Sequence, residues 1–136
     1  MQFSAIVDAV RAILPRDWAT APIAYPNEQF HQPGNEPWVY LEVLGAGAES
    51  SLFGSAGLRV AREDAVIFAH VFVPQGEGTD GAYAIAQQIG ELLRCQTLAP
   101  GIETEAPRIG PGERDEENGN TFRVSVSVPV TAHYTA

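Results

Sequence analysis

Apolar residues change period along the chain, and this change predicts where helices and strands lie. Between residues 2 and 14 they recur at helical spacing, which predicts an amphipathic helix that Pro15 ends. Residues 22–25 form a short extended piece. A second helical pattern runs to about residue 95, and Thr79 or Asp80 is suited to cap its start.

Three longer stretches alternate with the period of a strand. Residues 38–44 place aliphatic side chains on one face and aromatic or charged side chains on the other. Residues 64–73 are apolar on both faces, so we expect a central strand that is covered on both sides. Residues 121–134 have valines on one face, while the opposite face, toward water or a neighbouring subunit, carries Arg123, Ser125, Ser127 and Thr131.

The segments between these stretches have weaker patterns. Pro129 lies on the polar phase of the last strand and indicates an edge strand or a bulge. Residues 45–63 are rich in small side chains and predict a long mobile loop or an irregular hairpin. Residues 104–109 indicate a short strand, and residues 110–120 an acidic, turn-rich loop.

This order of elements predicts an α+β fold in one domain of residues 1–136. We expect a mostly antiparallel sheet, two helices packed on one face of it, and a long loop between the early strands.

The charge of the chain disfavours some classes of binding partner, and its cysteine content bears on its compartment. The formal net charge is −9 and all eight basic residues are arginine, so sequence-independent binding of DNA and attraction to anionic membranes are disfavoured. Cys95 is the only cysteine, which excludes an intrachain disulfide and fits a reducing compartment. No signal-peptide pattern or membrane-length apolar stretch occurs, so we expect a soluble, cytosolic protein.

The candidate chemical groups follow no catalytic or metal-binding motif. His31, His70 and His133 are far apart, and His70 in the apolar phase of a strand is typical of a satisfied core histidine. Cys95 is interpreted as a lone buried cysteine. The glycines at 45 and 47 lack the rest of a dinucleotide fingerprint. We therefore predict no catalytic residue, no cofactor, no metal ion and no enzymatic activity.

The stretch YPNEQFHQPGNEPWVYLEV, residues 25–43, combines aromatic, polar and proline residues. Its three prolines and the turn at Gly34 indicate a stiff connector that leads into a strand, with residues 29–36 exposed. The alternative is a small ligand-binding domain whose pocket is lined by Tyr25, Asn27, His31, Trp38 and Tyr40.

Several segments occur in an order that resembles a known family. They are API-A-YPNEQF, PWVYLEV, a Gly/Ser-rich loop, HVFVPQGEGT, DGAYAIAQQI, RIGPG and a terminal FRVSVSVPVTAHY. This order resembles the tail-terminator-like proteins of long-tailed bacteriophages and prophages.

The resemblance implies a structural virion protein without catalytic residues. Such proteins form a ring, typically a homohexamer, that caps the tail tube, ends its polymerisation and joins the tail to the head-side connector. The implied partners are further copies of the chain, the tail tube protein and the head-side connector protein. DNA passes through the ring without specific binding. The implied location is the neck of the virion, after assembly in the bacterial host cytoplasm.

The sequence also offers candidates for a subunit or tube interface. The 45–63 segment is expected to become ordered on contact with a neighbour or with the tube, and the connector and the last strand are expected to touch a neighbouring subunit. The candidate interface residues are His31, Phe53, Leu58, Arg59, Arg62 and Arg123. Another neck component, such as an adaptor or head-completion protein, is the alternative within virion structure.

Overall fold

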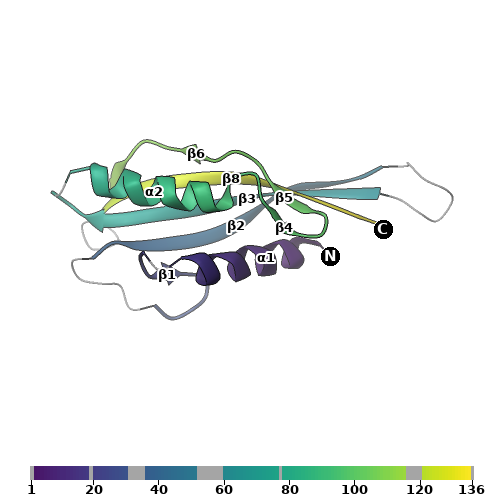
Figure 1. Ribbon diagram of the computed structural model, residues 1–136, viewed down its shortest axis with the longest axis horizontal. Coiled ribbons are helices and arrows are strands. Elements are labelled where there is room, and N and C mark those ends of the chain that lie inside the picture. Colours follow the sequence, from purple (N-terminus) through teal and green to yellow (C-terminus); the bar gives the residue numbers. More distant parts are fainter. Residues whose placement is uncertain are drawn as a thin grey trace.

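The computed structural model describes residues 2–18, 20–30, 36–51, 60–76, 78–115 and 121–135 (Figure 1). Its elements in chain order are α1 (Gln2–Asp17), β1 (Ile23–Ala24), β2 (Trp38–Ser51), β3 (Val60–Pro74), α2 (Asp80–Leu93), β4 (Thr97–Ala99), β5 (Ile102–Thr104), β6 (Arg108–Ile109), β7 (Glu113–Asp115) and β8 (Thr121–Thr135).

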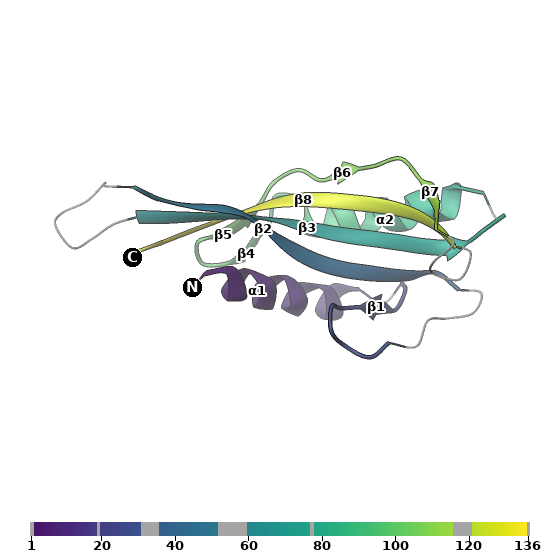
Figure 2. The same cartoon turned by 180° about the vertical axis from the view of Figure 1, so that it is seen from behind.

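The eight strands form one curled sheet in the order β1-β2-β3-β8-β5-β4, and β6 and β7 also pair with β8 (Figure 2). All pairings are antiparallel except that of β1 with β2. The three long strands β2, β3 and β8 form the body of the sheet, and β3 lies between the other two. The predicted α+β class is confirmed.

Both helices contribute to one hydrophobic cluster on a single face of the sheet, which we call the inner face. Ile6 and Val10 of α1 and Ile89 of α2 are fully buried in this cluster. The valine phase of β8 lies beneath them, and Val124, Val126, Val128 and Val130 are almost completely inaccessible. Burying each of these side chains contributes about 1.5–3 kcal/mol, so this face is the main source of the fold's stability.

The opposite face, called here the outer face, is not covered by either helix of the described residues. Val66, Phe68 and His70 of β3 point to it and are only partly buried. The prediction that this strand is covered on both sides was therefore wrong, although its central position was right. Apolar residues on both faces of β3 do not require a second layer of helices.

The helix ends differ from the predicted ones for identifiable reasons. α1 continues past Pro15 to Asp17, so Pro15 lies in the last turn of the helix, where its missing N–H leaves the Arg11 carbonyl without that donor. α2 ends at Leu93, where the buried Thr104 hydroxyl donates to the Leu93 carbonyl and accepts from the Gln96 N–H at 2.7 Å. Thr79 is the N-cap residue of α2, without a side-chain capping bond.

Residues 45–51 and 60–63 are paired strand rather than loop. β2 and β3 stay in register as far as Ser51 and Val60, with an irregularity between Gly45 and Gly47. Gly47 has a φ of 122°, a value that side chains disfavour. The irregular-hairpin interpretation is therefore confirmed for these residues, while residues 52–59 lie outside the described part of the chain.

Pro129 does not mark an edge strand, because β8 lies between β3 and the short strands β5, β6 and β7. It lies opposite the interval between β5 and β6. The Glu105 N–H donates to the Pro129 carbonyl at 2.9 Å, and the Glu105 carbonyl accepts from the Cys95 N–H at 3.4 Å. This second bond supplies the donor that proline lacks, so proline is tolerated in an internal strand.

The segment after α2 is more strand-like than predicted. The single strand expected at 104–109 is divided into β5 and β6, and β7 lies within the predicted acidic loop. β5, β6 and β7 are held by antiparallel pairing with β8.

Candidate functional site

The outer face is the candidate functional surface, since it combines uncovered apolar side chains with a polar network. The register places alternate residues of the three long strands on it. Its partly or fully exposed members include Tyr40, Glu42, Leu44, Val66, Phe68, His70, Ser125, Ser127, Pro129 and Thr131.

A histidine joins the three long strands on this face. His70 Nδ1 lies 2.6 Å from Ser125 Oγ on β8, and His70 Nε2 lies 2.9 Å from Glu42 Oε1 on β2. The predicted satisfied histidine is thus confirmed, but it lies on the outer face and its side chain is 17% exposed. Both ring nitrogens are engaged, so the network fixes the orientation of the imidazole.

Serine, histidine and glutamate side chains in contact also occur in nucleophilic catalysis. Acyl transfer additionally needs N–H donors aimed at a developing oxyanion. Ser125 lies within a long strand opposite His70, and its carbonyl accepts the Gly110 N–H at 2.9 Å. Its backbone is thus engaged in the sheet, and the network is best described as a polar link between strands.

Aromatic rings close one end of the outer face. Trp38 stacks on Phe72 with ring centroids 4.2 Å apart, and Phe30 packs on Trp38 at 5.2 Å. Trp38 is only 5% exposed. Phe30 belongs to the connector after β1, so this segment folds over the sheet as well as leading into β2.

The residues of the hypothetical ligand pocket do not converge. Tyr25 packs with the inner cluster, whereas Trp38 belongs to the separate cluster with Phe72. The Arg11 guanidinium lies 4.3 Å from the Tyr25 ring centroid and forms an ion pair with Glu28. Burial raises the pKa of Tyr25 above its ordinary value, and Arg11 opposes that rise. A cavity of about 180 Å³ adjoins Tyr25.

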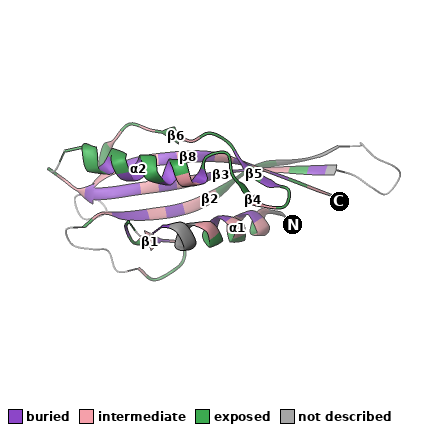
Figure 3. Ribbon diagram, viewed as in Figure 1, coloured by how far each residue is buried: buried purple, intermediate pink, exposed green. Residues whose placement is uncertain are grey.

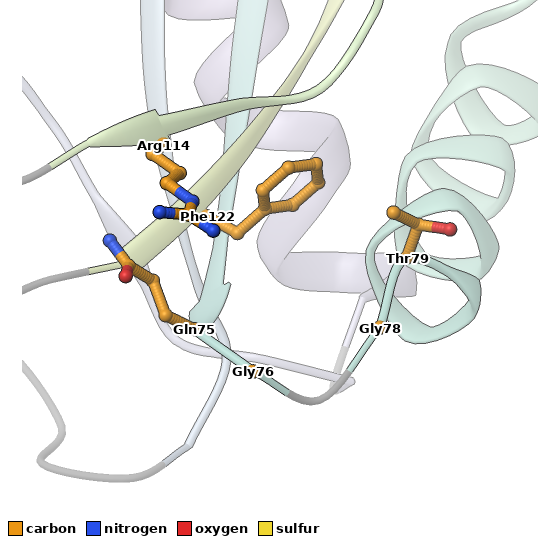
Figure 4. A pocket seen from close by; sticks show the side chains of 6 residues that line it. All are labelled: Gln75, Gly76, Gly78, Thr79, Arg114 and Phe122. Atoms are coloured by element: carbon orange, nitrogen blue, oxygen red, sulfur yellow. The ribbon is translucent and has the colours of Figure 1, made fainter.

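A larger hollow of about 390 Å³ lies where β3 leads into α2 (Figure 4). Gln75 and Arg114 line one side, Thr79 at the start of α2 lies across from them, and the Phe122 ring lies between. Sequence patterns did not predict this hollow, although glycines 76 and 78 favour an open turn. Its lining is largely exposed, and nothing in it assembles a catalytic group.

Two of the candidate interface residues are described, and both lie on the outer face. Arg62 pairs with Asp64 at 2.9 Å, and Arg123 forms an ion pair with Glu113. Arg123 of β8 lies opposite Phe72 of β3. Phe72 is ten residues from Arg62 along β3, so the two arginines are separated by about 33 Å along the sheet. They share a face but not a cluster. His31, Phe53, Leu58 and Arg59 lie outside the described residues.

The large apolar side chains that are most exposed within the described residues were not among the predicted interface residues. They are Leu44 at 48%, Ile109 at 44% and Tyr83 at 38% (Figure 3 shows burial along the chain). Periodicity assigned Leu44 to a strand and Tyr83 to a helix, but exposure depends on which neighbours pair with those elements. Cys95 is also exposed, so its assignment as a buried cysteine was wrong.

The described residues contain no cluster of three or more metal-ligating side chains. None of their helices is long and apolar enough to cross a bilayer.

Comparison with known proteins assigns the family. The family model described as "Phage tail terminator protein" matches residues 5–130, and the chain belongs to this family. This family is a structural, non-enzymatic kind of phage tail protein, and membership of it implies interaction with other tail or head proteins. No curated protein matches the chain.

The same fold occurs among solved structures. One of them aligns with a TM-score of 0.64 at 19% identity, over 94% of this chain and 96% of the other. At this identity the likeness supports the fold alone.

Proposed function

We propose that the protein forms a ring, a homohexamer, at the head-proximal end of the phage tail tube. There it stops addition of further tube subunits and offers the surface to which the head-side connector binds. Membership of the tail terminator family carries this proposal. The uncovered sheet face also supports it, because exposed apolar surface is often an interaction site. This face carries the partly exposed Val66 and Phe68 and the exposed Leu44.

The charge of the chain is compatible with a lumen through which DNA slides. A formal net charge of −9 in each copy repels phosphate groups, so DNA is not retained. The protein folds as a single domain over residues 1–136, assembles in the host cytoplasm and becomes part of the neck of the virion. Arg62 and Arg123 take part in contacts with neighbouring subunits or the tube.

The test measures mass and tube length together. Purified protein is examined by light scattering after size exclusion and by negative-stain microscopy, alone and with the tail tube protein. The expected result is a six-copy ring, and tubes that stop growing when the ring is added. A particle that remains monomeric in both conditions and leaves tube growth unchanged overturns the proposal. Binding only to the head-side portal complex would instead indicate another neck component.

A further inference from the structure

We infer that neighbouring copies meet through two unlike rims of the sheet, the β2 rim around Leu44 and the β6 rim around Ile109. The inference rests on the proposed ring and specifies its subunit contact. The two exposed residues, the strand edges beside them and the charges around them support this contact.

The β2 rim is an open strand edge. β1 pairs only with Val39 and Tyr40, so within the described residues β2 has no strand partner on that side from Leu41 to Ser51. An unpaired strand edge offers backbone donors and acceptors that can bind another chain, and residues 44–47 of this edge are exposed. Leu44 belongs to this edge strand, its side chain lies on the outer face, and it is 48% exposed although it adjoins the apolar Val66 on β3.

The β6 rim lies on the opposite side of the sheet. β6 pairs with β8 on the side away from β3, and no further strand of the described chain pairs with it (Figure 1). Ile109 is exposed there. Tyr83 belongs to the same side of α2 as Gly90, seven residues further along, because i and i+7 share a helix face. Gly90 faces Pro107, immediately before β6.

Two different apolar patches on opposite sides of one subunit favour head-to-tail contact. A two-fold dimer uses the same patch on both copies and leaves the other patch exposed, whereas a head-to-tail contact buries both patches and closes into a ring when the rotation closes. The exposed Leu44 and Ile109 are thus accounted for together by one kind of contact.

Charge also favours a second copy as the occupant. Copies with a net charge of −9 repel one another unless their contact contains locally complementary groups. Arg108 adjoins Ile109, is exposed, and forms no ion pair within the described residues. It lies opposite Ser127 and therefore on the outer face, as do Glu42 and Leu44 of the β2 rim. The exposed Glu36 precedes β2 on that rim.

The experiment uses two variants, Leu44→Glu and Ile109→Glu. Each variant replaces the exposed apolar side chain of one rim with a carboxylate. Each variant alone is expected to lose the ring and to elute as a monomer, while keeping the wild-type melting temperature. Ala84→Glu, at an exposed position on the side of α2 opposite its buried residues, is the control and should still form the ring.

Mixing the two variants gives the decisive observation. The Leu44→Glu copy keeps an intact β6 rim and the Ile109→Glu copy an intact β2 rim, so the mixture should form a dimer with one copy of each and no ring. Rings formed by either variant, or a mixture that stays monomeric, overturn the inference while the wild-type ring still supports the proposed function. A wild-type protein that forms no ring even on the tail tube overturns the proposed function and the inference with it.

Discussion

The imidazole of His70 and the hydroxyl of Ser125 meet at 2.6 Å across β3 and β8, on the face that the helices leave uncovered. Removing the serine hydroxyl leaves one ring nitrogen of a mostly buried histidine without its partner. We expect Ser125→Ala to lower the free energy of unfolding by about 1 kcal/mol, as measured by urea denaturation. Ser127→Ala changes the same chemistry two residues along the same face and should have a smaller effect. Equal losses would show that the link contributes nothing.

Gly101 is required by the turn between β4 and β5. It follows Pro100, has a φ of 81°, and a Cβ at this position would lie 2.6 Å from the carbonyl oxygen of His133. We expect Gly101→Ala to destabilise the fold by at least about 1–2 kcal/mol, because both the backbone angle and the contact are unfavourable.

Gly81 provides the matched control for that substitution. A Cβ there meets nothing within 4 Å, and the residue lies in the first turn of α2. Gly81→Ala should therefore raise the free energy of unfolding by about 0.5 kcal/mol. Thermal unfolding of both variants gives the comparison, and a stabilising Gly101→Ala would contradict the described turn.

Trp38 is expected to matter for stability rather than for ligand binding. Trp38→Ala removes a buried ring that stacks on Phe72, so it should cost about 3–5 kcal/mol. Tyr83→Ala removes an exposed aromatic side chain and should change the free energy of unfolding by less than about 0.5 kcal/mol. Denaturant titration followed by circular dichroism measures both. A fully stable Trp38→Ala protein would reopen the ligand-pocket hypothesis.

Tyr25 should make stability fall at alkaline pH. Its pKa in the folded protein is raised above the ordinary 10.0 by burial, which exceeds the opposing effect of Arg11. When the pKa of a group is higher in the folded than in the unfolded protein, its contribution to stability is complete below the unfolded-state pKa. That contribution is lost as the pH rises through the folded-state pKa. Unfolding measured across this range should show a smaller alkaline loss for Tyr25→Phe, which keeps the ring against Arg11. An identical profile for both proteins would contradict the assignment.

The sequence predicted the inner face well because that face depends on local periodicity. Valines two residues apart lie on one face of β8, and apolar residues at helical spacing lie on one face of α1. These two faces are buried when they pack toward the same core. The sequence left residues 45–51 open between a mobile loop and an irregular hairpin, since glycine, alanine and serine carry no alternation. β7 was missed for a related reason: its charged residues do not favour a strand, and pairing with β8 imposes one.

The candidate surface was harder to predict than the core. Arg123 was assigned to the correct face because its phase is opposite to that of the valines. The exposure of Leu44 and Ile109 depends on where β1 stops and on which strands pair with β8, and these are contacts between distant parts of the chain. The link between Glu42 and His70 likewise spans 28 residues and has no local signal.

The position of β8 has a consequence for synthesis on the ribosome. It is the last described strand in the chain, yet it lies inside the sheet and is the pairing partner of β3, β5, β6 and β7. A nascent chain that has not yet emerged beyond residue 120 lacks the strand with which these four strands pair. The apolar faces of α1 and α2 then lack the valines of β8 that help to cover them. The sheet therefore cannot be completed before residues 121–135 have left the ribosome, and until then the earlier elements lack their shared partner.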